Sequence, residues 1–220
     1  MKMLRQVSGL VVVSVALLLA GCAGNQPVRY SGIDSAAKLS ANTDDNYERM
    51  PWRYSPQVNW RKYDSIIIDP VKIYQGTDGQ FDDIAQADRQ ALATHMQDVF
   101  SKSLSARFKA VSTPATGTLR LKLTLTGADT TPQVVGTVTK FDLAGGPYNI
   151  VQSVRGGRGL MSGSVDYAVE IYDASSHELL KAYVAHQYPN AMNISASIGS
   201  LSAAEVGIEK GAEELAEMLQ

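Results

Sequence analysis

The sequence has one cysteine and no surplus of basic charge, and each shortage excludes a class of protein. A single Cys among 220 residues can form neither an internal disulfide nor a thiolate metal cage. Lys and Arg number 20 against 22 Asp and Glu, a formal net charge of −2, which argues against a nucleic-acid-binding surface. Apolar residues make up 45% of the chain and charged residues 19%. This balance predicts one globular domain with a sizeable core.

The sequence also has no hydrophobic run long enough to span a membrane. Its longest apolar run lies near the amino terminus. Residues 10–20 are apolar except for Ser14, and Lys2 and Arg5 precede them. The run is well short of the roughly 20 apolar residues that a spanning helix needs. A positive start followed by a short apolar stretch is typical of an export signal. We therefore expect residues 1–21 to be a signal peptide that is cleaved from the mature chain.

The expected signal ends in Leu19, Ala20, Gly21 and Cys22, which resemble the lipobox of bacterial lipoproteins. The resemblance implies that the thiol of Cys22 becomes a thioether to diacylglycerol and that its amine receives an N-acyl chain such as palmitate. It further implies that these acyl chains attach the protein to a membrane, with no other cofactor. A buried cysteine after an ordinary export signal is the alternative for this residue.

Residue 23 bears on the location of such a lipoprotein. It is Ala, where Asp would resemble the signal for retention in the inner membrane. By that resemblance we expect a protein anchored in the cell outer membrane of a Gram-negative bacterium and facing the periplasm. Removing Lys2 and Arg5 from the 20 basic side chains leaves 18 against 22 acidic ones, a net charge of −4. A basic patch is therefore not expected to strengthen attachment to anionic lipid.

Residues 22–46 have many Gly, Ser, Asn and Asp and almost no apolar periodicity. This composition predicts a flexible tether behind the acylated Cys22. Some 25 residues of such a chain have a root-mean-square reach of roughly 25–30 Å. We therefore expect the folded domain to stand clear of the membrane surface.

The remaining residues, 47–220, are expected to form a single globular domain. Alternation of apolar and polar residues predicts strands with one solvated face, and apolar spacing of three and four predicts amphipathic helices. The expected strands lie at 65–74, 119–126, 164–171 and 179–187, and the expected helices at 84–108 and 204–219. This order predicts an α/β (α+β) two-layer fold, with two amphipathic helices on one face of a largely antiparallel mixed sheet. In element order it is similar to the swapped-hairpin domains of envelope lipoproteins.

Aromatic residues gather where the expected tether meets the domain. Trp52, Tyr54 and Trp60 lie in this junction, which contains both tryptophans of the chain. Large rings at such a place cap the edge of a core or form a recognition surface. They are therefore candidate partner-binding residues, with packing as the alternative.

Residues 130–159 form an insertion that fits no regular element. Val135, Val138 and Phe141 are interleaved here with Gly and Pro, which gives apolar content without a clean period. Such an insertion folds onto the core or binds a partner. We include these three residues among the candidate contacts for a partner.

Catalytic and metal-binding patterns are missing from the sequence. The three His residues, His95, His177 and His186, have no metal-ligand spacing. No nucleophile elbow, phosphate loop or dinucleotide fingerprint is present. The Arg-Gly-Gly-Arg-Gly run at 155–159 is more typical of a glycine turn than of an RNA-binding box. We expect no enzymatic activity, no metal and no nucleic-acid partner.

Two stretches resemble a known family of Gram-negative lipoproteins. Residues 60–71 read Trp-Arg-Lys-Tyr-Asp-Ser-Ile-Ile-Ile-Asp-Pro-Val, and residues 169–173 read Val-Glu-Ile-Tyr-Asp, followed by Glu-Leu-Leu at 178–180. From about Tyr47 onward the chain resembles the family known as domain of unknown function 3313 (DUF3313). His177 stands where a Gly usually precedes the Glu in such hairpins, at some cost if the turn needs a positive φ. The resemblance implies a location and an architecture but no activity.

These observations favour a non-enzymatic outer-membrane lipoprotein that binds another component of the cell envelope. The second hypothesis is a homo-oligomeric envelope assembly or secretion-pore-like component built through the insertion. The third is a small-ligand binder or hydrolase with a pocket under the insertion, where Asp142 would pair with Arg155 or Arg158.

Overall fold

A computed structural model of the chain describes residues 26–81, 83–130, 145–155, 157–158, 162–191, 193 and 199–220. The strands are β1 (Ser40–Ala41), β2 (Trp52–Tyr54), β3 (Ser65–Ile68), β4 (Lys72–Ile73), β5 (Lys109–Ala110), β6 (Thr118–Asp129), β7 (Ser164–Asp173) and β8 (Leu179–Gln187). The α-helices are α2 (Gln86–Ser105), α4 (Gly145–Arg155) and α5 (Ser202–Met218), and the 3-10 turns are η1 (Ala36–Lys38) and η2 (Trp60–Lys62). Within these residues no helix is both long enough and apolar enough to cross a bilayer.

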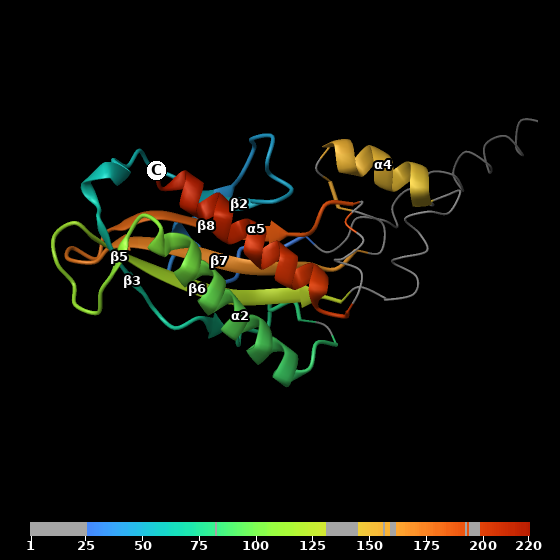
Figure 1. The fold of residues 1–220 in the computed structure, drawn as a ribbon, viewed down its shortest axis with the longest axis horizontal. Coiled ribbons are helices and arrows are strands. Elements are labelled where there is room, and N and C mark those ends of the chain that lie inside the picture. The colour runs from blue at the N-terminus through green and yellow to red at the C-terminus, as the bar shows by residue number, and fades with distance from the viewer. Residues whose placement is uncertain are drawn as a thin grey trace, which may run out of the picture.

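All eight strands belong to one mixed sheet, in the order β1-β2-β8-β7-β6-β3-β5, with β4 pairing to β6 beside β3. The long central strands β6, β7 and β8 are antiparallel, and the short strands β3, β4 and β5 join in parallel pairs at one side. Helices α2 and α5 pack against each other on one face of this sheet (Figure 1). The predicted α+β fold with two helices on one face is thereby confirmed.

The core between helices and sheet is built from the alternating side chains that the sequence placed on one face. Leu119, Leu121, Leu123 and Leu125 of β6 are at most 1% exposed. The ring of Tyr167 on β7 meets Phe100 of α2 edge to face, with centroids 5.8 Å apart, a favoured aromatic geometry. Burial of this apolar face is what fixes the register of the central strands.

Helix α5 lies very close to the sheet because it carries glycine at two facing positions. A methyl group on Gly211 would lie 1.6 Å from the hydroxyl of Tyr167, and one on Gly207 would lie 3.0 Å from the carbonyl of Gln187. Both helical glycines are therefore required by the close approach of α5 to β7 and β8.

The opposite face of the sheet is covered by residues 26–41, which we call the strap. Tyr30, Ile33 and Leu39 of the strap are buried. The backbone N–H of Ser35 donates to the carboxylate of Glu170 on β7 at 2.5 Å, and β1 pairs with β2. The prediction of a flexible tether over residues 22–46 is therefore wrong for the described part of that range. The solvated second face predicted for β6 and β7 is also wrong, since the strap covers it.

Three further predictions need adjustment. The strand expected at 65–74 divides into β3 and β4 around Pro70, which cannot donate to a ladder. The helix expected at 84–108 is shorter, since α2 begins at Gln86 and ends at Ser105. The described residues of the insertion at 130–159 include the helix α4, whereas residues 131–144, 156 and 159 lie outside the described part of the chain.

Candidate functional site

One end of the sheet collects most of the unusual features of the molecule, and we call it the loop end. Strands β6 and β8 finish there and β7 begins there, with Asp129 facing Ser164 and Val165 facing Gln187. The described chain also starts there. The side-chain amide of Gln80, whose backbone bridges to Gly127, donates to the carbonyl of Gln26 at 3.3 Å.

Helix α4 lies at the loop end, beyond the point where β8 finishes (Figure 1). It is linked to the chain just after β8, because the hydroxyl of Ser153 donates to the side-chain oxygen of Asn190 at 2.8 Å. Its Asn149 is fully buried. The polar side of α4 therefore faces the protein.

The other side of α4 is apolar and faces outward. Tyr148, Ile150, Val151 and Val154 are 44%, 56%, 46% and 85% exposed. A helix on the surface of a soluble domain normally buries its apolar side and exposes its polar one. The orientation of α4 is the reverse, which marks the surface as a contact site. We call these four side chains the α4 face.

A cluster of titratable groups, of which Asp166 and His186 are buried, lies behind the loop end. Asp166 on β7 and His186 on β8 face each other across the ladder, with a carboxylate oxygen 2.5 Å from Nδ1 of the ring. Burial is the largest influence on Asp166 and raises the pKa of its carboxyl, while the His186 partner acts in the opposite direction. Beside them Arg158 binds Asp129 at 3.0 Å, and the hydroxyl of Ser164 donates to the same carboxylate at 3.0 Å.

The exposure of the Asp166–His186 pair limits what it can do. The two residues are 5% and 2% exposed, so a substrate cannot reach the carboxylate or the ring. Among the residues that the structure describes, no group of three or more His, Cys, Asp or Glu side chains could hold a metal ion. The pair therefore joins β7 to β8, and Arg158 joins the residues beyond α4 to β6.

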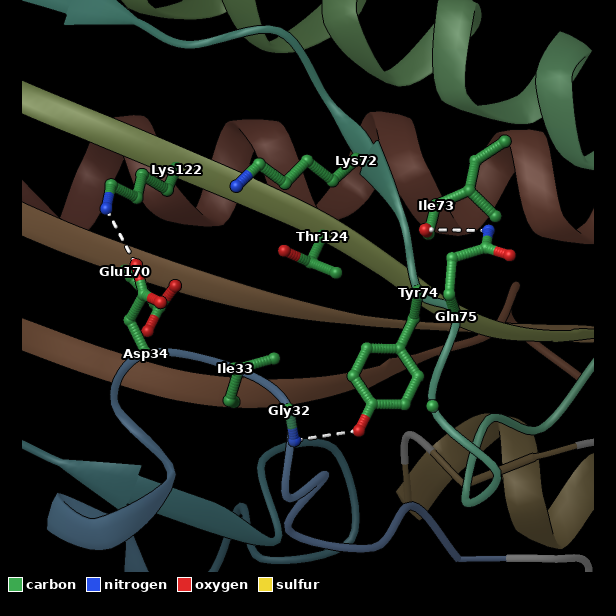
Figure 2. A pocket seen from close by; sticks show the side chains of 11 residues that line it. Gly32, Ile33, Asp34, Lys72, Ile73, Tyr74, Gln75, Lys122, Thr124 and Glu170 are labelled. Carbon is green, nitrogen blue, oxygen red and sulfur yellow. Dashed lines mark hydrogen bonds and ion pairs between the residues drawn. The ribbon is translucent and has the colours of Figure 1, made fainter.

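A pocket opens between the strap and the parallel side of the sheet. Its volume is about 220 Å³. Figure 2 shows that strap residues line it on one side and sheet residues on the other. The lining residues are Gly32, Ile33, Asp34, Lys72, Ile73, Tyr74, Gln75, Gly76, Lys122, Thr124 and Glu170.

Most polar groups of this pocket hold the strap in place. Lys122 binds Asp34 at 2.7 Å, and this hydrogen bond lowers the pKa of the Asp34 carboxyl. The hydroxyl of Tyr74 accepts from the N–H of Gly32 at 2.8 Å and donates to Asp78 at 2.7 Å. Burial raises the pKa of Tyr74, which keeps it a neutral donor. The pocket is thus the seam between strap and sheet.

The three aromatic candidates from the sequence are engaged in packing. Trp52 and Tyr54 lie on β2, half-buried against the core. The indole N–H of Trp52 donates to the carbonyl of Pro27 at 3.0 Å. Trp60 lies in η2 with its ring 6.5 Å from that of Tyr63. The structure does not bring these residues together with the α4 face, and their role in partner binding stays a prediction.

The remaining candidates lie outside the described residues. These are the lipobox residues Leu19, Ala20 and Gly21, the lipidation site Cys22, and the insertion residues Val135, Val138 and Phe141. Sequence reasoning missed both the α4 face and the Asp166–His186 pair. Pro147 in the first turn and apolar residues at 150, 151 and 154 were signals of a helix. For the buried pair, no local pattern distinguished Asp166 from a solvated residue.

Fold and site together define an α+β domain whose sheet is covered by two helices on one face and by an amino-terminal strap on the other. The chain belongs to the family described as a protein of unknown function, DUF3313, whose model matches residues 29–215. The match begins inside the strap, earlier than the resemblance seen from about residue 47. No curated protein matches the chain.

Two solved structures show a distant similarity. A variant PelC dodecamer from Paraburkholderia phytofirmans is 12% identical, with a TM-score of 0.39 over 74% of this chain and 93% of that one. A second PelC dodecamer from the same organism is 12% identical, with a TM-score of 0.38 over 74% and 94%. At such TM-scores the similarity says nothing about the assembly of this chain.

Proposed function

We propose that this chain is a non-enzymatic lipoprotein, anchored in the outer membrane through Cys22 and facing the periplasm, that acts as a binding or accessory module for another envelope component. The amino-terminal motif at residues 19–22 and the short signal before it support the anchor. The polar clusters support a non-enzymatic role, since the Asp166–His186 pair is buried, Lys122 is engaged with the strap and Arg158 is paired with Asp129.

One structural observation supports a short distance between the anchor and the domain. The chain is docked on the domain from Gln26 and Pro27 onward, through Gln80 and Trp52. Only residues 23–25 separate Cys22 from this docked part. Four extended residues span at most about 14 Å. An acylated Cys22 would therefore hold the loop end close to the lipid surface, instead of on the long tether that the composition suggested.

Replacing Cys22 tests the anchor. In cells fed radiolabelled palmitate, the wild-type protein should take up label and fractionate with the outer membrane. Cys22→Ser should take up no label and should not reach that fraction as a processed protein. Ala23→Asp is the matched control for the address: by the family resemblance it should be labelled equally but recovered with the inner membrane. Palmitate uptake by Cys22→Ser would overturn the proposal.

Photocrosslinking tests the binding role. A photoreactive amino acid at Lys72, in the pocket of Figure 2, and another at the exposed Tyr47 sample two faces away from α4. A discrete crosslinked envelope protein at either position is the expected result. Crosslinks between copies of this chain would instead favour the homo-oligomeric alternative, and an absence of any discrete product at both positions would contradict a specific protein partner.

A further inference from the structure

We propose that the α4 face inserts into the interfacial layer of the bilayer that carries the Cys22 anchor, as a second membrane contact of the domain. The inference rests on the proposed function, because it requires that anchor. The inference assigns a lipid surface as the partner of α4, whose apolar side is exposed and not buried in the core.

Exposure singles out α4 within the described residues. Among the described residues, six large apolar side chains are exposed, and four of these six belong to the α4 face. Single exposed apolar residues are ordinary, but a contiguous group on one helix marks an interaction site. The fully buried Asn149 on the opposite side of α4 shows that the helix is fixed with its apolar side outward.

The position of α4 favours a lipid surface over other occupants. It lies at the loop end, where Gln26 is held by Gln80 beside the end of β6 and where Ser153 is bonded to Asn190 after β8. The span of at most about 14 Å from Cys22 to residue 26 keeps this end next to the headgroups. An interfacial helix buries its apolar side about 5–10 Å into the headgroup and acyl boundary, which is within that reach.

The chemistry of the face also fits an interfacial position. Aliphatic side chains form its centre, and the phenol of Tyr148 supplies a ring of the kind that settles at headgroup level. Arg155 is exposed at the end of the helix, where its guanidinium can reach lipid phosphates while its stem stays in the apolar layer. Because the anchor makes this contact intramolecular, a helix of 11 residues with little affinity of its own suffices.

The formal charge predicts how the contact responds to lipid composition. The chain beyond residue 21 has a net charge of −4, since Lys2 and Arg5 are lost from the 20 basic side chains against 22 acidic ones. Attraction to anionic lipid therefore contributes little. Insertion of the α4 face should occur on zwitterionic vesicles and should change little with salt, because apolar burial is not screened.

Depth-dependent fluorescence quenching tests the proposal on the acylated full chain. The only native cysteine is Cys22, and its sulfur is blocked by the lipid, so a thiol-reactive fluorophore labels only an introduced cysteine. Val154→Cys reports on the α4 face. Ser176→Cys, in the exposed turn between β7 and β8 at the opposite end of the sheet, is the matched control. Both proteins are reconstituted into phosphatidylcholine vesicles that contain lipids with a quencher on the acyl chain.

The expected result is roughly threefold or greater quenching at position 154 relative to position 176, since the interfacial side of such a helix enters the acyl boundary. A second test places the fluorophore at Tyr148→Cys and adds Val151→Asp together with Val154→Asp. This change should reduce quenching to the control level, whereas Tyr47→Asp, at another exposed aromatic position, should leave it unchanged.

Three outcomes would overturn the proposal, and they differ in what they leave standing. Equal, weak quenching at positions 154 and 176 in protein that floats with the vesicles removes the membrane contact and leaves the anchor intact. A shielded probe at position 154 that lipid quenchers do not affect, together with crosslinks between copies, assigns the α4 face to self-association. Failure of the wild-type chain to take up palmitate and to float removes the anchor, and with it the inference.

Discussion

The carboxylate of Asp166 lies 2.5 Å from the Nδ1 atom of His186, and both residues are withdrawn from solvent. They occupy facing positions on β7 and β8. The sequence predicted a solvated face here, so the burial of this pair requires a cover that the local pattern did not indicate. Burial and the nearby Asp166 carboxylate raise the pKa of Tyr30 in the strap, and the ring of Tyr188 meets that of His186 at 5.3 Å. The strap and the chain after β8 therefore share the cover of the pair.

Asp166→Asn should change the pH dependence of stability. Burial raises the pKa of Asp166 above its ordinary value of 3.8. Between pH 3.8 and the raised pKa, the folded state therefore binds more protons than the unfolded state. In that window the stability of the wild-type chain falls relative to Asp166→Asn as the pH rises. Urea unfolding of both proteins across the acidic range measures this difference. The exposed Asp45→Asn is the control and should leave the pH profile unchanged; a pH-independent difference for Asp166→Asn would contradict the assignment.

Removing the ring of His186 should cost more than neutralising its partner. His186→Ala leaves the Asp166 carboxyl buried without its hydrogen-bonding neighbour, and breaking a buried pair in this way costs about 3–5 kcal/mol. Asp166→Asn keeps an acceptor of similar shape, and a smaller loss is expected. Chemical denaturation of the two variants near neutral pH compares them. Equal losses would mean that the contact adds little beyond packing.

His177→Gly should stabilise the protein. The residue has φ 61° in the turn between β7 and β8, the left-handed region that costs a non-Gly residue roughly 1–2 kcal/mol. The greater freedom of Gly in the unfolded chain offsets about 0.5–1 kcal/mol of that gain. Thermal denaturation should show a rise in Tm. The neighbouring Ser176→Gly lacks this relief and should lower Tm, so a fall for both variants would refute the turn argument.

Gly211→Ala should destabilise the protein although Ala is favoured in helices by about 1 kcal/mol. Its methyl group would meet the hydroxyl of Tyr167, which is buried and has no hydrogen-bond partner among the described residues. Tyr167→Phe alone should therefore be neutral or stabilising by about 1 kcal/mol. In the double variant the loss from Gly211→Ala should shrink. A double-mutant cycle by urea unfolding measures this coupling, and strict additivity would show that α5 shifts freely.

The parts of the fold that could be predicted are those whose pattern reports on burial. Leu119 to Leu125 alternate because one face of β6 meets the helices, and the apolar spacing at 204–219 reports the side of α5 that packs on the sheet. The family resemblance raised a positive φ at residue 177 as a condition, since a Gly usually stands there, and His177 has φ 61°. In each case the local sequence contains the physical cause.

The strap and α4 were missed because their causes lie elsewhere in the chain. The apolar anchors of the strap are Tyr30, Ile33 and Leu39. Its docking also depends on distant partners such as Glu170, which lies 135 positions after Ser35. Apolar periodicity is a signal of burial, so it misleads for α4, whose apolar side faces outward. Asp166 has the pattern of a solvated strand residue, because the sequence around it gives no sign that other segments cover it.

Tyr30→Ala should release the strap. Tyr30 is 1% exposed; its ring meets Tyr74 edge to face at 5.4 Å, and its hydroxyl donates to Gln80 at 2.6 Å. Loss of a buried aromatic side chain costs about 3–5 kcal/mol, and this loss is concentrated here on a short segment. Local opening of the strap should therefore become frequent before the domain itself unfolds.

Limited trypsin digestion measures that opening, because Arg29 and Lys38 lie within the strap. A docked strap resists cleavage at both residues, whereas a flexible tether would be cut at once in the wild-type chain. In Tyr30→Ala, cleavage after these residues should accelerate while the far-UV circular dichroism of the domain is retained. Tyr47→Ala, which removes an exposed ring, should leave the cleavage rate unchanged. If the wild-type strap is cut as fast as the variant, residues 26–41 do not restrain the loop end, and the short distance between Cys22 and the domain no longer follows.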